Sequence, residues 1–196
     1  MTLEAEERAS GKQHPRVAIV LNNLALTYRQ ANDNQSAEPL LRRALAIQQK
    51  SLGLTHPAVA TTMNNLGSLL QSAGKLEEAE RLERAALRIL QQRLGPQTVE
   101  MATACTNLAD LLWTKGSKAE AAALYRKALA VDEFVYGPEH PEVAGDLTNL
   151  GSLLKETGQT KEAAALLQRA LAIFEKQLGP NSEQAVQARE NLRSLH

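Results

Sequence analysis

The chain has 196 residues, of which 43% are hydrophobic and 22% are charged, with 22 basic and 22 acidic side chains and no formal net charge. This composition is typical of folded domains with a buried core and argues against a chain that is disordered throughout. It lacks the basic excess expected of a protein that binds nucleic acid or anionic lipid, so we expect neither nucleic acid nor membrane as a partner.

The N-terminal residues and the cysteine content predict a cytoplasmic protein. The first ten residues, MTLEAEERAS, contain acids where a secretory signal would need a basic start and an apolar run. The single cysteine, Cys105, cannot form an internal disulfide. No apolar stretch approaches the roughly 20 residues that a membrane-spanning helix requires.

The main feature of the sequence is a pattern that recurs every 42 residues. Asparagines recur with this period at Asn23, Asn65, Asn107, Asn149 and Asn191. Two breaker positions share the period, one at Gly53, Gly95, Gly137 and Gly179 and the other at Asn32, Gly74, Gly116 and Gly158. Because glycine, and next to it asparagine, adopts the left-handed backbone that ends a helix, each period contains two helices.

In chain order, the pattern predicts one solenoid domain over residues 1–196. A partial helix in 1–13 precedes four helix pairs in 14–55, 56–97, 98–139 and 140–181, and a capping helix occupies 182–196. The partial helix in 1–13 lacks the first helix of its own repeat, so we expect a longer array cut on its N-terminal side. The last has Arg193 where earlier repeats have Ala or Gly, which predicts a solvent-facing end of the array.

These residues resemble a known family. Asn-Leu-Gly or Asn-Leu-Ala, a Leu or Tyr three residues later, a turn glycine and two alanines seven apart resemble the tetratricopeptide repeat. The 42-residue period and connectors such as LGLTHP (52–57) resemble the kinesin light chain subclass. The resemblance implies an all-α fold, a right-handed superhelical solenoid of antiparallel helix pairs whose first helices line a concave groove. The sequence departs from the shorter 34-residue form by lacking an aromatic at four positions, so aliphatic packing is expected at Leu21, Met63, Cys105 and Leu147.

Helical periodicity separates a packing face from a groove face in each first helix. At 100° per residue, Val17, Leu21 and Ala25 share one side, and Asn22, Asn23 and Leu26 share the other. The candidate peptide-binding groove therefore consists of Asn22, Asn23, Leu26, Arg29, Asn64, Asn65, Ser68, Gln71, Thr106, Asn107, Asp110, Trp113, Asn149, Ser152 and Lys155.

The asparagine ladder has two interpretations. An amide offers a donor and an acceptor, so Asn23, Asn65, Asn107 and Asn149 could pair with the backbone of an extended peptide. The resemblance favours this reading, because family members use asparagines here to hold a partner's backbone or its terminal carboxylate. Alternatively, each asparagine bonds to the neighbouring repeat and shapes the array.

Trp113, the single tryptophan, is a candidate anchor for a bound peptide because aromatic residues are enriched at binding hot spots. It could instead lie over an adjacent helix and shield apolar surface. Kinesin light chains bind peptides with a tryptophan flanked by acids through a basic groove. In this sequence Arg29 and Lys155 are balanced by Asp110 and Glu156.

The sequence contains no pattern that indicates catalysis. His14, His56 and His140 each precede a proline in a turn, one per repeat, where helix capping explains them better than a shared metal site. Cys105 takes a core position, and the Gly-Pro turns lack the strand and the lysine of a phosphate loop. We expect no enzyme, no cofactor and no metal.

The function predicted is a non-catalytic protein-interaction scaffold that binds a peptide or partner segment in the groove. Two alternatives stay open: a self-association module, or a regulatory or targeting segment of a larger multidomain signalling protein. The expected partner is a protein or peptide, and the chain itself is expected to be a monomer or a weak homodimer.

Overall fold

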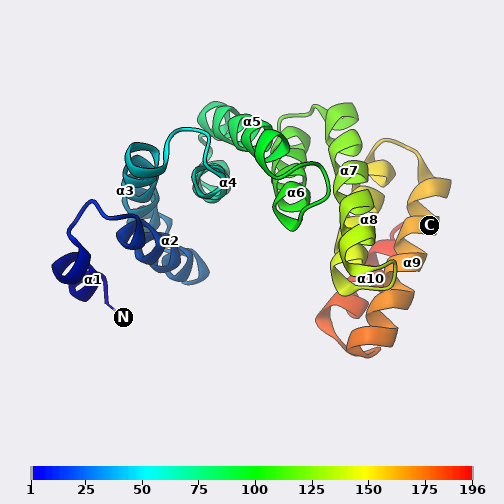
Figure 1. Cartoon of the computed structure of the whole chain (residues 1–196). Helices are drawn as coiled ribbons and strands as arrows, with labels where there is room; N and C mark the ends of the chain where they lie inside the picture. The colour runs from blue at the N-terminus through cyan, green and yellow to red at the C-terminus, as the bar shows by residue number, and fades with distance from the viewer. Residues whose placement is uncertain (1, 196) are drawn as a thin grey trace. The chain divides into compact units, whose positions relative to one another are not determined.

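The computed structural model describes residues 2–195, and every regular element in that range is an α-helix (Figure 1). The all-α prediction is confirmed. In chain order the helices are α1 (Leu3–Ser10), α2 (Pro15–Gln30), α3 (Asn34–Leu52), α4 (Pro57–Ser72), α5 (Leu76–Arg93), α6 (Val99–Thr114), α7 (Lys118–Tyr136), α8 (Pro141–Glu156), α9 (Thr160–Leu178) and α10 (Glu183–Arg193).

The helices fall into two compact units. Unit 1, Met1–Gly95, contains α1 to α5, and unit 2, Pro96–His196, contains α6 to α10. Within the units α2 packs against α3, α4 against α5, α6 against α7, and α8 against α9, while α1 packs on α2 and α10 on α9. Each of the four pairs lies inside a predicted repeat. That the whole chain forms a single domain stays a prediction.

The turns have the positive-φ backbone conformation that the recurring glycine and asparagine positions predict. Gly53 and Gly137 follow α3 and α7 with φ of 85° and 86°, in the region that glycine tolerates and other residues rarely adopt. Asn32 has a φ of 59° and is the one non-glycine residue between 2 and 195 with a positive φ. Asparagine therefore replaces glycine at the first mid-repeat turn, as the period of 42 indicates.

Three helices begin at a proline and have a histidine as the capping residue directly before it. The Nδ1 atom of His140 accepts a hydrogen bond from the Glu142 backbone N–H at 3.2 Å, and His14 and His56 cap α2 and α4 in the same way. The proline at the first helical position needs no hydrogen-bond partner for its nitrogen. The helix-capping interpretation of these histidines is confirmed.

The cores consist of small and aliphatic side chains. In unit 1, Val17, Leu21, Ala44 and Ile47 form a cluster between α2 and α3. The equivalent cluster in unit 2 contains Leu147, Ala170, Ile173 and Phe174. Leu21, Cys105 and Leu147 are fully buried at positions where the sequence lacks the aromatic of the 34-residue repeat that it resembles, whereas Met63 is only half-buried. Aliphatic packing is thus confirmed at three of these four positions.

Close helix contact depends on two glycines. A Cβ atom added at Gly151 would lie 2.9 Å from Leu167 Cγ, and one added at Gly67 would lie 2.6 Å from Glu83 Cγ. Ala25 and Ala109, which occupy the same position in other repeats, are fully buried. Arg193 shares this position in α10 and is exposed.

Candidate functional site

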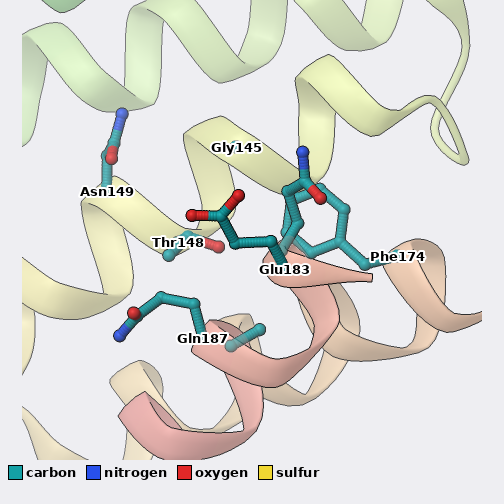
Figure 2. A pocket seen from close by; sticks show the side chains of 8 residues that line it. Gly145, Thr148, Asn149, Phe174, Glu183 and Gln187 are labelled. Atoms are coloured by element: carbon teal, nitrogen blue, oxygen red, sulfur yellow. The ribbon is translucent and has the colours of Figure 1, made fainter. Parts of the chain in front are cut away.

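Each unit contains a pocket built by a first helix, its second helix and the next first helix. The unit 1 pocket, between α2, α3 and α4, has a volume of about 250 Å³ and is lined by Ile19, Asn22, Asn23, Leu26, Gln48, Ala58, Thr61, Thr62 and Asn65. The unit 2 pocket, between α8, α9 and α10, has a volume of about 380 Å³ and is lined by Gly145, Thr148, Asn149, Phe174, Glu183, Gln184, Gln187 and Ala188 (Figure 2).

The two pockets occupy the same place in the repeat. Asn149 in unit 2 corresponds to Asn23 in unit 1 after three periods of 42 residues, and Phe174 corresponds to Gln48 in the same way. Of the predicted groove residues, Asn22, Asn23, Leu26 and Asn65 line the unit 1 pocket and Asn149 lines the unit 2 pocket, while their role in binding stays a prediction. The sequence analysis did not include the second-helix residues Gln48 and Phe174 among the groove residues. Their separation of three 42-residue periods is the signal that could have shown that they occupy equivalent positions.

A hydrogen-bond chain crosses the floor of the unit 1 pocket. Thr62 Oγ1 donates to Gln48 Oε1 at 2.7 Å, and Asn22 Nδ2 donates to Thr62 Oγ1 at 2.9 Å. Asn65 Nδ2 donates to Asn22 Oδ1 at 3.4 Å. Asn22 and Asn65 therefore have partners inside unit 1. Among residues 2–195 nothing bonds to the exposed side-chain amide of Asn23.

The asparagine ladder is thus divided between two environments. Like Asn23, the half-buried side chains of Asn107 and Asn149 make no hydrogen bond to any residue that the structure describes. Asn64 departs from its expected orientation: it is 5% exposed and its Oδ1 atom has no hydrogen-bond partner in the described part of the chain. Asn23, Asn107 and Asn149 are therefore the amides available to an incoming partner.

Cations at the ends of two first helices reach to the next first helix. Arg29 Nη2 donates to Ser68 Oγ at 3.0 Å, and Lys155 Nζ donates to Ser194 Oγ at 2.5 Å. These pairs are equivalent, three periods apart. Burial lowers the pKa of Arg29. Of the other predicted groove residues in these helices, Leu26 is exposed, whereas Ser152 and Gln71 are half-buried.

Trp113 is anchored by its own unit. Its Nε1–H donates to Glu156 Oε2 at 2.9 Å, and its ring meets the Tyr125 ring edge-on at 6.3 Å between centroids. The Tyr125 hydroxyl donates to Asp110, whose pKa is raised by burial. Asp110 and Trp113 therefore belong to one contact network over α7, in which Trp113 is half-buried.

In unit 2 a buried acid pair, one acid on α7 and one on α8, stands where unit 1 has Gln48 and Thr62. Asp132 of α7 and Asp146 of α8 are 8% and 5% exposed, and Thr106 Oγ1 donates to Asp146 at 3.4 Å. Burial, followed by the negative charge of Asp132, raises the pKa of Asp146 to about 7. Sequence reading missed this pair, although Asp132 and Asp146 stand two periods after Gln48 and Thr62.

Three further features of the described part of the chain concern metal binding, the single cysteine and membrane spanning. Within residues 2–195 no three histidine, cysteine or acidic side chains gather where they could hold a metal ion. Cys105 is buried, and burial raises the pKa of its thiol to about 11. None of the helices between residues 2 and 195 combines the length and apolar character needed to cross a membrane.

Comparison with known proteins identifies relatives of this architecture. A profile described as tetratricopeptide repeat matches residues 1–50, 35–92 and 100–176. A crystal structure of kinesin light chain nearly identical TPR-like repeats from Podosopora anserina is 26% identical, with a TM-score of 0.81 over 93% of this chain and 86% of that one. BtubC (BKLC) from P. vanneervenii is 25% identical, with a TM-score of 0.76 over 87% of this chain and 68% of that one. No curated protein sequence shows a significant match.

Proposed function

Because the chain belongs to the tetratricopeptide repeat family, we propose that it is a non-catalytic, cytoplasmic scaffold that binds a peptide or an extended segment of a partner protein along its first helices. At each pocket the backbone of a bound segment lies along the rim, and a side chain of that segment enters the pocket. One observation carries this proposal. Two equivalent pockets, one in each unit, have an asparagine amide at the rim that makes no hydrogen bond to any described residue.

The polarity of the pockets supports an extended peptide as the ligand. Asn23 and Asn149 each offer one donor and one acceptor, which matches the N–H and C=O groups of a strand. Since these groups occur in every peptide, the amides supply affinity without reading side chains. Sequence preference comes from the pocket floors, which are polar at Gln48 and aromatic at Phe174.

The test is selection of peptides from a displayed random library on the full chain, followed by measurement of their affinity for variants. Asn23→Ala and Asn149→Ala are expected to weaken binding of the selected peptides and to leave the unfolding free energy unchanged. Thr27→Ala is the control, because Thr27 is exposed on α2 and, among residues 2–195, its hydroxyl donates only to the Asn23 carbonyl. A library that yields no peptide, or peptides that bind both asparagine variants normally, would refute the proposal.

Self-association is a second candidate, favoured by a groove between α1 and α2. This groove has a volume of about 600 Å³, and its lining includes Leu3, Ile19, Val20 and Leu24. Ile19 is 57% exposed, unusual for a side chain whose burial is favourable. If the groove pairs two chains, Ile19→Glu lowers the mass measured by light scattering at high concentration. An unchanged monomer mass in wild type and variant removes this candidate.

A further inference from the structure

The acidic side chains of unit 2 differ between second and first helices. On second helices three glutamates form ion pairs: Glu133 with Arg169 at 2.6 Å, Glu162 with Arg126 at 2.9 Å, and Glu175 with Arg189 at 2.6 Å. Glu139, in the turn before α8, pairs with Lys176. These pairs leave the outer surface of unit 2 close to electrically balanced.

The first helices of unit 2 keep an excess of negative charge. Glu100, Glu142, Glu183 and Glu190 lie on α6, α8 and α10, are exposed, and form no ion pair with any residue that the structure describes. The first helices of unit 1 have the opposite character, since α2 and α4 contain Arg16 and Arg29 and no acid. The two units therefore present different charges to a partner.

The unit 2 pocket combines this charge with an aromatic floor. Glu183 projects from the first turn of α10 toward Thr148 of α8, and Phe174 lies behind it on α9 (Figure 2). No lysine or arginine lines the pocket. Three nearby cations are engaged elsewhere, since Arg189 bonds to Glu175 and to the Pro180 carbonyl, Lys155 to Ser194 and Lys176 to Glu139.

The mouth of this pocket is open because Gly145 stands where unit 1 has Ile19. A Cβ atom added at Gly145 would meet no atom within 4 Å, so the space above it is free. A long side chain can enter there, lay its methylene groups on Phe174 and bring a charged end to Glu183. Lysine and arginine have this amphipathic shape, and their cations are attracted to aromatic faces.

We propose that the α8–α9–α10 pocket binds an arginine or lysine side chain of the partner peptide, so that unit 2 selects cationic segments. The proposal rests on the peptide-binding function proposed above and adds its chemistry. The Glu183 carboxylate accepts a charge-assisted hydrogen bond from the guanidinium or ammonium group, the amide oxygens of Gln184 and Gln187 accept further bonds, and Asn149 holds the adjacent backbone.

The first experiment asks which residues the selected peptides contain. The random library is selected on the full wild-type chain and then counter-selected on Gly145→Leu, whose added side chain fills the mouth of the pocket. Peptides that bind wild type but not Gly145→Leu, and therefore remain after the counter-selection, are expected to be enriched in arginine and lysine. Enrichment without a basic residue overturns this inference and leaves the peptide-binding function standing, whereas no enrichment at all overturns both.

The second experiment isolates the charge. One selected peptide is synthesised with arginine and with citrulline, its neutral isostere, and both affinities are measured by fluorescence anisotropy. The arginine form is expected to bind about tenfold more tightly to wild type, and Glu183→Gln is expected to reduce this ratio to near one. Equal affinity of the two peptides for wild type overturns the proposal.

Glu162→Gln is the matched control for this substitution. Glu162 also lies in the first turn of a helix of unit 2, but it is paired with Arg126 outside the pocket. It tests whether loss of one negative charge at a helix start is enough to change binding. The arginine preference is expected to persist in this variant, and an equal loss in both variants refutes a role specific to Glu183.

Discussion

Asp146 of α8 and Asp132 of α7 are two buried acids at the contact between these helices, and the negative charge of Asp132 adds to burial in raising the pKa of Asp146. Burial raises the pKa of both side chains, and in Asp146 the raised value is about 7. Ionising both buried carboxyl groups is unfavourable, because each loses hydration and the two negative charges repel. The pair therefore shares one proton near neutral pH. His140 and Glu142 lie close enough to influence the charge of Asp132, and they oppose one another.

The acid pair makes unit 2 sensitive to pH. Because the folded pKa of Asp146 lies above the ordinary value of 3.8, the folded chain binds more protons than the unfolded chain between about pH 4 and pH 7. The free energy of unfolding therefore falls as the pH rises through this window. We expect Asp146→Asn, which places a neutral amide beside Asp132, to stabilise the protein at pH 8 by about 2 kcal/mol and to have little effect at pH 5.

Urea unfolding at both pH values measures this effect. Glu162→Gln serves as the control, because it removes an exposed acid of the same unit without touching the pair. If the stability difference between wild type and Asp146→Asn is the same at pH 5 and pH 8, the two carboxyl groups do not share a proton.

Neighbouring asparagines of α2 are expected to respond differently to substitution. Asn22→Ala removes hydrogen bonds to Thr62, Asn65 and the Ala18 carbonyl and should lower the unfolding free energy by about 1 to 2 kcal/mol. Asn23→Ala removes an exposed amide and should change stability by less than about 0.5 kcal/mol. Chemical denaturation of both variants provides the comparison, and equal losses would mean that Asn23 is also structural.

Two glycines of α8 are expected to have opposite effects. Gly151→Ala places a methyl group 2.9 Å from Leu167 Cγ and 3.4 Å from the Ala163 carbonyl, so we expect destabilisation by about 1 to 3 kcal/mol. Gly145→Ala meets nothing within 4 Å, and the gain in helix propensity should stabilise by up to about 1 kcal/mol. Thermal unfolding of the pair measures the difference, and a stable Gly151→Ala variant would show that α8 and α9 can separate without cost.

The histidine cap of α8 can be tested by replacement and rescue. His140→Ala removes the hydrogen bond to the Glu142 N–H and the stacking on Tyr136, whose ring centroid lies 4.5 Å away, and should cost about 1 kcal/mol. His140→Asn restores a capping oxygen without the ring. Calorimetry of the two variants separates cap from stacking: recovery by asparagine identifies the cap as the main contribution, and no recovery identifies the stacking.

Much of the helical architecture could be predicted from the sequence because local rules dictate it. Glycine at Gly53 and Gly137 and asparagine at Asn32 mark helix ends through backbone conformations that few residues adopt. His140 and Pro141 mark a helix start through hydrogen bonding and a restricted φ. Repetition every 42 residues made each of these signals stronger than a single occurrence would be.

The pockets could be predicted only in part. Asn23 and Asn149 were assigned to the groove from helical periodicity, which indicates the face of a helix but not its partners. Whether an amide is used internally depends on what lies opposite: Asn22 meets Thr62, whereas Asn149 meets no donor or acceptor among the described residues. Glu183, Phe174 and the acid pair were missed because they come together only when α9 and α10, or α7 and α8, pack.

The sequence by itself determined the repeat, the ends of the helices and the small residues at close contacts, because these depend on backbone conformation and on a period that recurs along the chain. The tertiary structure alone decided which polar groups are satisfied, which acids stay unpaired and where a side chain has room to enter. Those properties depend on distances between side chains on different helices, and packing of the helices is what sets those distances.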